Sequence, residues 1–190
     1  MLLYRHALKG IFLSFLLLSQ SYANETVTEE ETPPAPVYAK GAELFGITFN
    51  DLSKAQFEMH LKKMGLEPYP SYREGVASYS LGKNGILGIK ELTVRYNQHQ
   101  YVEKATLSGV VESPELRAQL GSVLLHKYGQ PDVGFVRDGY GRARWQLPDN
   151  TDIELRNTTF DVSVVYIDRV PKAVSPSGRI DVEALLKRNQ

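Results

Sequence analysis

Apolar residues recur at helical spacing in a first stretch that begins shortly after residue 50. Phe57, Leu61 and Met64 would lie on one face of a helix, and Ser53 and Gln56 have the spacing of a capping box. Glycine and proline follow at positions 65 and 68 and would stop the helix. The pattern predicts one amphipathic helix that begins near Ser53.

A second helical pattern is bounded by clear start and stop residues. Ser113 can act as the N-cap, Pro114 suits the first turn, and Gly129 with Pro131 would end the helix. The apolar positions between them are Leu116, Leu120, Val123, Leu124 and Tyr128. These signals predict a second amphipathic helix.

Segments with strand character follow each predicted helix. They are residues 76–81, 92–96 and 101–111 after the first helix, and 143–147, 151–156 and 160–167 after the second. Residues 97–100 and 148–150 suit tight turns. In the last strand Phe160, Val162, Val164 and Tyr166 should share one face.

The order of helix and then strands, met twice, predicts an α+β fold. Hairpin connections favour an antiparallel sheet, and we expect both helices on one of its faces. The end of the first helix, Leu61–Gly65, is echoed by Leu125–Gly129 near the end of the second. The similarity has two explanations. Either the domain consists of two repeated α-β-β(-β) units, or both segments simply carry the lysine and glycine that are common at helix ends.

The N-terminus resembles a cleavable export signal. Residues 1–23 contain Arg5 and Lys9, an apolar run, and small residues at Ser21 and Ala23, which predicts cleavage after Ala23. The alternative is an uncleaved anchor, but the apolar run is shorter than the roughly 20 residues of a membrane-spanning helix. We therefore expect no stable transmembrane segment in the mature chain.

Three regions should follow the signal. Residues 24–40 are acidic and proline-rich, which predicts a disordered leader, and residues 41–170 should form the α+β domain. Residues 171–190 read as a linker and a short amphipathic C-terminal helix or tail. That helix could dock on the domain, bind a partner or fray.

The amino-acid composition limits the cellular compartments and the classes of partner that fit this chain. The chain has 190 residues and no cysteine, which excludes disulfides, zinc–cysteine sites, iron–sulfur clusters and a thiol nucleophile. Loss of residues 1–23 removes two of the 22 basic residues and none of the 22 acidic ones, leaving a net charge of −2. An exported chain without cysteine fits a Gram-negative periplasm, with secretion as the alternative, and nucleic acid is not an expected partner.

The chain resembles a known superfamily in architecture. Gly46, Ile47 and Thr48 lead into a short helix and then a hairpin, and the arrangement recurs. This resembles the periplasmic helix-plus-hairpin modules of the outer-membrane assembly lipoprotein and beta-lactamase-inhibitor-protein superfamily. The resemblance implies a protein-binding domain without an active site. Because the chain lacks a lipidated cysteine and has long strand regions, it implies neither membrane attachment nor a particular partner.

Few residues are arranged for catalysis or for holding a cofactor. His60, His99 and His126 form no local metal-binding pair, so we predict no metal, no cofactor and no catalytic residue. Asp149, with Asp152 and Glu154, clusters at a predicted turn, where turn chemistry is the simpler explanation and an ion or catalytic site the alternative.

The segment from Asp132 to Trp145 contains the candidate contact residues. Its glycines would permit a mobile loop, and Arg137, Tyr140, Arg142 and Arg144 could bind the carboxylates or phosphates of a partner. The alternative is an exposed hairpin tip that leads into a strand. In that case Trp145 and Leu147 would point into the core.

Together these observations favour a non-catalytic exported domain that binds a protein or another component of the cell envelope. A periplasmic or outer-membrane protein is the expected partner. Two other classes stay open: a hydrolase of envelope polymers that uses a carboxylate pair, and a carrier with a small-ligand groove between helices and sheet.

Overall fold

The computed structural model describes residues 36–70, 72–111, 113–158 and 160–173. The predicted signal, the leader up to residue 35 and the predicted C-terminal helix lie outside these residues. All described residues belong to one compact unit that begins at Pro36.

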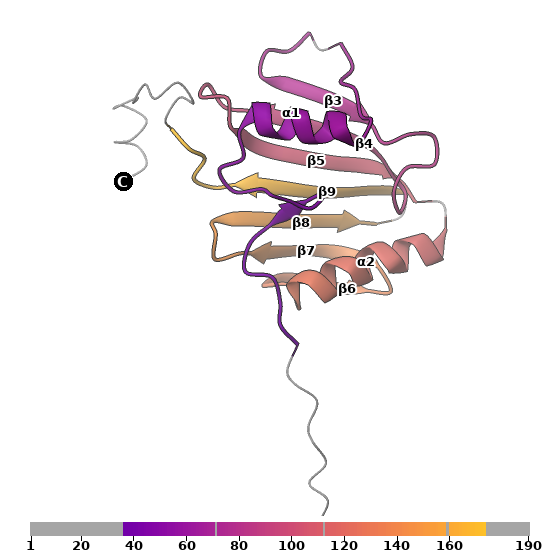
Figure 1. Cartoon of the computed structure of the whole chain (residues 1–190). Helices are drawn as coiled ribbons and strands as arrows, with labels where there is room; N and C mark the ends of the chain where they lie inside the picture. Colours follow the sequence, from indigo (N-terminus) through magenta and orange to yellow (C-terminus); the bar gives the residue numbers. More distant parts are fainter. Residues whose placement is uncertain (1–35, 71, 112, 159, 174–190) are drawn as a thin grey trace, which may run out of the picture. The chain divides into compact units, whose positions relative to one another are not determined.

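A large antiparallel sheet and two helices make up this unit (Figure 1). The small hairpin of β1 (Glu43–Leu44) and β2 (Ile47–Thr48) precedes helix α1 (Lys54–Lys63). The remaining elements are β3 (Val76–Ser80), β4 (Ile89–Tyr96), β5 (Val102–Val110), α2 (Pro114–Tyr128), β6 (Val133–Arg137), β7 (Tyr140–Gln146), β8 (Thr151–Asn157) and β9 (Asp161–Asp168). The predicted α+β class with an antiparallel sheet is confirmed.

Both helices begin where their capping residues predict. Ser53 caps α1 with a complete capping box, and Ser113 caps α2 with Pro114 in the first turn. The apolar stripes are narrower than expected, because Met64 of the first and Val123 of the second are 44% and 52% exposed. Phe57 and Leu61 of the first stripe, and Leu120, Leu124 and Tyr128 of the second, are buried in the core.

The main sheet joins two strand meanders. Its order is β3-β4-β5-β9-β8-β7-β6, so the last strands of the two meanders, β5 and β9, pair at its centre. Each helix precedes its own meander. In Figure 1 helix α1 lies in front of the part of the sheet formed by β3, β4 and β5, and α2 lies over β6 and β7.

One face of this sheet forms the core. Two rows of paired residues cross it from strand to strand, and every member is buried. The rows are Tyr79, Leu92, Leu107, Val164, Leu155 and Ala143, and Ala77, Val94, Ala105, Tyr166, Ile153 and Trp145. Phe57 of α1 and Leu120 of α2 belong to the same apolar cluster. Burial of this face is the main source of stability.

The opposite face, which we call the open face, carries the alternating residues. Asp152, which pairs with Ile167 and Gln146 on this face, is 7% exposed, whereas no residue of the two rows beside it is buried. These rows are Ser78, Thr93, Thr106, Val165, Glu154, Arg144 and Val133, and Ser80, Glu91, Ser108, Ser163, Arg156, Arg142 and Phe135. Strand alternation therefore separates an apolar core face from a mainly polar one.

The β6–β7 hairpin agrees with the hairpin-tip interpretation of this segment and not with a mobile glycine-rich loop. Gly134 and Gly141 allow two strand backbones to approach closely, since a Cβ on either residue would collide with the carbonyl oxygen of Arg142 or Phe135. The turn is Asp138–Gly139, with positive φ at both residues, as a two-residue hairpin requires. The glycines serve close packing. Trp145 and Leu147 point into the core, as the alternative prediction required.

The ends of the unit and the start of β9 also differ from expectation. Residues 36–40 were assigned to the leader, yet the Ala39 N–H donates to the Lys127 carbonyl at 2.9 Å. At the other end Asn97 Nδ2 donates to the Lys172 carbonyl at 3.0 Å. Phe160 precedes β9 and is 73% exposed, so it does not share the core face with Val162.

Gly139 offers a test of how α2 holds the hairpin. A Cβ at Gly139 would lie 2.0 Å from the Arg117 carbonyl oxygen, whereas a Cβ at Gly46 would meet nothing within 4 Å, although φ is +80° at both. We expect Gly46→Ala to lower the unfolding free energy by about 1 kcal/mol through backbone strain alone. Gly139→Ala should cost about 1–3 kcal/mol more because α2 must shift. Denaturant titrations measure both, and equal losses would contradict this packing.

Candidate functional site

A shallow groove of about 600 Å³ lies on the open face, over strands β6 to β9. Its side-chain lining is supplied by four strands. The residues are Val133, Gly134, Arg142, Ala143, Arg144, Glu154, Leu155, Arg156, Ser163 and Val165. Three arginines and one glutamate are the charged residues among them, so we call it the basic groove.

Two of these arginines face each other without a counter-ion. Arg142 of β7 is the direct cross-strand partner of Arg156 of β8, and both side chains are exposed. Within the described part of the chain, neither forms a salt bridge or a side-chain hydrogen bond. Like charges opposite each other destabilise a sheet, so this pair is not explained by folding.

The third arginine is neutralised within the sheet. Arg144 forms an ion pair with Glu154, its own cross-strand partner on β8. This pair is solvent-exposed and adds little to stability. It leaves the guanidinium groups of Arg142 and Arg156 as the uncompensated charge of the basic groove.

Apolar side chains border the charged pair. Phe135 of β6 lies opposite Arg142 and is 65% exposed, and Val133 is 60% exposed. Val165 of β9 contributes to the floor of the groove. Guanidinium forks bind carboxylates through paired hydrogen bonds, and arginine and aromatic side chains are enriched among the residues that dominate binding energy at protein interfaces.

The four residues singled out from the sequence divide into two groups. Arg142 and Arg144 line the basic groove, whereas Arg137 and Tyr140 do not. Arg137 is exposed at the end of β6. The centre of the Tyr140 ring instead lies 4.4 Å from the guanidinium carbon of Arg117 on α2. Tyr140 therefore has a structural contact that a loop interpretation did not foresee.

Arg117 of α2 forms hydrogen bonds to the ends of two strands of the sheet. It is 2% exposed and donates to the Asn157 side chain, to the Thr158 carbonyl, and to the Val111 carbonyl at 3.2 Å. These bonds connect α2 with the end of β8 and the end of β5. Together with the stacked Tyr140, they hold the hairpin that carries Arg142.

The sequence analysis did not identify Phe135 and Arg156 as candidate site residues, for two different reasons. Phe135 was placed in a loop, so no strand register was assigned to it. Arg156 was placed on a strand, and a usable signal was present: counting outward from the turn at Asp149 sets Arg142 opposite Arg156. Pairing the strands through that turn would have revealed the arginine pair.

The acidic cluster around the second turn has structural partners. Asp149 accepts hydrogen bonds from the Ala42 N–H at 2.8 Å and the Thr151 N–H at 3.0 Å. Asp152 pairs with Arg169 at 3.1 Å, and Glu154 pairs with Arg144. These contacts agree with turn chemistry, and the described residues contain no group of three or more histidine and acidic side chains suited to a metal ion.

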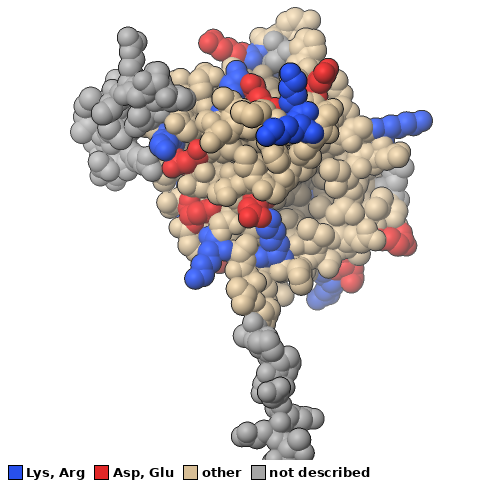
Figure 2. Space-filling model, in the orientation of Figure 1, with Lys and Arg blue, Asp and Glu red and all other residues tan. Residues whose placement is uncertain are grey.

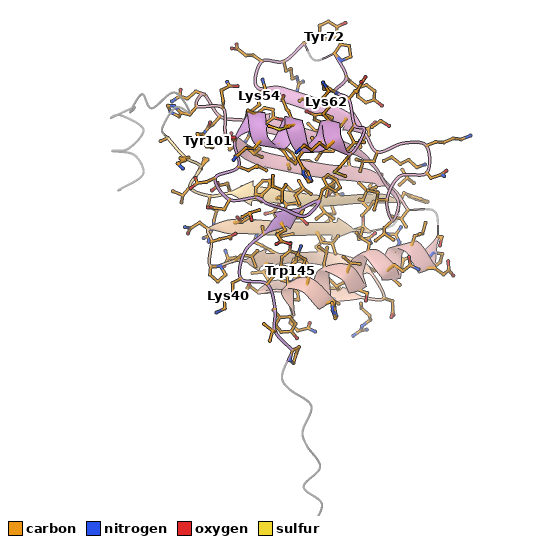
Figure 3. The ribbon with its side chains drawn as sticks, viewed as in Figure 1. Lys40, Lys54, Lys62, Tyr72, Tyr101 and Trp145 are labelled. Atoms are coloured by element: carbon orange, nitrogen blue, oxygen red, sulfur yellow. The ribbon has the colours of Figure 1, made fainter. Side chains whose placement is uncertain are left out.

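Other aromatic groups are dispersed. Tyr79 is buried, whereas Tyr69 is half exposed and Tyr72 extends from the loop between α1 and β3 (Figure 3), so the three do not line one groove. Burial raises the pKa of Tyr96 and of Tyr166 far above the ordinary 10.0, so both phenols stay protonated even in moderately alkaline solution.

Residues of α2 line two further shallow grooves, of about 710 and 690 Å³. On the side of the molecule drawn in Figure 2, basic and acidic side chains are scattered in small mixed groups among neutral residues. Neither described helix is long and apolar enough to cross a membrane. In comparisons with known proteins, the chain matches no family model, no curated protein and no solved structure.

The arginine pair makes a prediction about stability. Arg156→Thr should leave the unfolding free energy unchanged or raise it by about 0.2–1 kcal/mol, because a like-charge pair is replaced by a residue favoured in strands. Arg95→Thr is the matched control, since Arg95 is also exposed on a strand but pairs with Glu103 at 3.0 Å. Urea titrations at low salt compare them. A clear loss for Arg156→Thr alone would show that the arginine supports the fold.

Proposed function

We propose that this protein is an exported, non-catalytic binding module whose basic groove takes up acidic side chains of a partner protein. The observation that carries the proposal is the cross-strand pair Arg142 and Arg156, two exposed guanidinium groups without a counter-ion among the described residues. A carboxylate between them would relieve their repulsion and accept paired hydrogen bonds.

The proposal includes the compartment that the N-terminus indicates. Residues 1–23 would direct export and be removed after Ala23, and the mature protein would act in the periplasm of a Gram-negative bacterium. A periplasmic or outer-membrane protein with an acidic surface is then the partner. The suggested relation to periplasmic helix-plus-hairpin modules, which bind proteins, agrees with this assignment.

Two features of the architecture belong to the proposal. Both helices would cover the same sheet face and leave the other free for docking, and the two helix-meander halves would be versions of one unit. Neutral and polar side chains, such as Thr93, Thr106 and Ser108, extend from the basic groove across the rest of the open face. A partner seated on the arginines could therefore spread over several strands.

The affinity should come from a few residues. An exposed arginine–carboxylate pair contributes only about 0.2–1 kcal/mol, so two such pairs need the apolar border to give a specific complex. Phe135 and Val133 supply that border, and truncation of an aromatic residue that acts as a binding hot spot costs about 2 kcal/mol or more. Binding should weaken as salt rises, since the charges are exposed.

Crosslinking in the native cell envelope tests this function. The protein should capture a partner, and Arg142→Glu with Arg156→Glu should reduce capture at least about tenfold, because two attractive charges become repulsive. Arg95→Glu with Lys90→Glu is the matched control: both residues are exposed on β4, outside the basic groove. Capture that is equal for both double variants would remove the basic groove from the function.

A further inference from the structure

The two edges of the main sheet differ in what lies beside them. At one edge, β3 is accompanied by the loop that precedes it: the Tyr69 N–H donates to the Ser78 carbonyl at 2.7 Å, and Pro68 forms a bridge with Tyr79. At the other edge, β6 is the lowest strand in Figure 1. Among the described residues, β6 has backbone partners on β7 alone. Its outer edge can therefore accept a further strand.

The register of the hairpin shows which backbone groups form this outer edge. Arg137 and Tyr140 close a two-residue turn, and such a closing pair exchanges hydrogen bonds. Phe135 lies two residues before Arg137, and its carbonyl oxygen is directed at the backbone of β7. The residues between hydrogen-bonded pairs direct their N–H and C=O groups the other way. Gly134 and Val136 thus present the free donors and acceptors of β6.

The side chains of β6 would meet an added strand on the open face. Val133, Phe135 and Arg137 occupy alternate positions, so they share this face, and all three are exposed. An added strand would place one side chain next to Phe135, in line with Arg142 and Arg156, and another next to Arg137. The first of these positions lies two strand spacings, or about 10 Å, from Arg142. Arginine and glutamate side chains together can bridge this distance over the Phe135 ring.

An acidic strand suits this edge better than a second copy of the chain. Within the described residues Arg137, Arg142 and Arg156 form no salt bridge and no side-chain hydrogen bond. If the β6 strands of two copies paired about a two-fold axis, these arginines would lie on one face of the joined sheet and repel each other. Carboxylates at alternate positions of an added strand would neutralise them instead.

We propose that the partner lays an extended acidic segment along β6, as an eighth strand of the main sheet, with carboxylates at alternate positions facing the arginines. This inference rests on the proposed function, because it specifies how the partner presents its acidic side chains. Backbone hydrogen bonds supply affinity in such strand addition, and alternate side chains supply specificity. The inference also gives a role to Arg137, which lies outside the basic groove.

Hydrogen exchange in the full chain tests the added strand. The probe is a synthetic peptide in which glutamate alternates with valine and threonine. The amides of Gly134 and Val136 should exchange at least about tenfold more slowly when the peptide is present in excess, because they gain hydrogen-bond partners. The amides of β3, at the other edge, should not change. Unaltered exchange at Gly134 and Val136 overturns the inference.

Methylation of the peptide backbone separates strand addition from simple charge attraction. Two variants carry N-methyl groups on one or the other alternate set of amides, so their charge and composition match. One set would face β6, and its methylation should weaken binding at least about tenfold, since several hydrogen bonds are lost. The other set should retain most of the affinity. Equal affinity for both variants and the unmodified peptide, measured by fluorescence anisotropy, contradicts an added strand.

Arg137→Glu tests the neighbour that the basic groove does not include. The substitution sets a carboxylate directly beside a glutamate of the peptide, so binding should weaken at least about fivefold. Lys90→Glu is the matched control, since Lys90 is exposed on β4, away from this edge. Equal effects of the two substitutions on binding would remove Arg137 from the site and overturn the inference.

Comparison with capture in the cell envelope distinguishes this inference from the proposed function. If the peptide leaves Gly134 and Val136 unprotected while capture still depends on Arg142 and Arg156, acidic side chains bind without an added strand. The inference then fails and the proposed function stands. If the peptide protects both amides but capture ignores the arginines, the edge of β6 accepts an acidic strand and the proposed function of the basic groove fails instead.

Discussion

The pairing of β5 with β9 is the constraint on which the rest of the structure depends. Seven residue pairs, from Lys104 with Ile167 to Val110 with Asp161, join two separate meanders into one continuous sheet. Because strand alternation is kept across this seam, one set of apolar residues forms a single core face. The polar residues are collected on the other face for the same reason. A slip of one residue at the seam would exchange the two faces.

The same constraint sets the position of the arginines. β8 pairs with β9 and β7 with β8, so the register of the seam determines that Arg142 and Arg156 lie opposite each other on the open face. Helix α2 then holds the end of the hairpin, through Arg117, through the close approach to Gly139, and through Trp145, whose Nε1–H donates to the Gly129 carbonyl at 2.9 Å. The groove is therefore rigidly supported by residues that do not line it. Such support lowers the entropic cost of binding.

Local signals in the sequence predicted most of the helices, strands and turns, but they could not predict which strands pair or in which register. The caps of both helices and the turns at Asn97 and Asp149 depend on a few neighbouring residues, and each was predicted where it lies. β6 was missed because Gly134 and Gly141 read as flexibility, whereas they relieve backbone contacts visible only once the strands are paired. Likewise, Arg142 could be chosen as a candidate because it is an arginine, but its position opposite Arg156 could be found only from the register of β7 with β8. Tyr140 was placed at the site because its buried partner, Arg117, lies far away in the sequence.

Protection of the open face in the cell tests the central claim most directly. Ser163→Cys places a lone thiol at the floor of the basic groove, and Val123→Cys places one on the exposed side of α2. Modification by a small thiol reagent should be several-fold slower in intact envelopes than in the purified protein for Ser163→Cys, with no such change for Val123→Cys. Equal rates in both settings for Ser163→Cys would mean that nothing docks on the open face, and would contradict the account.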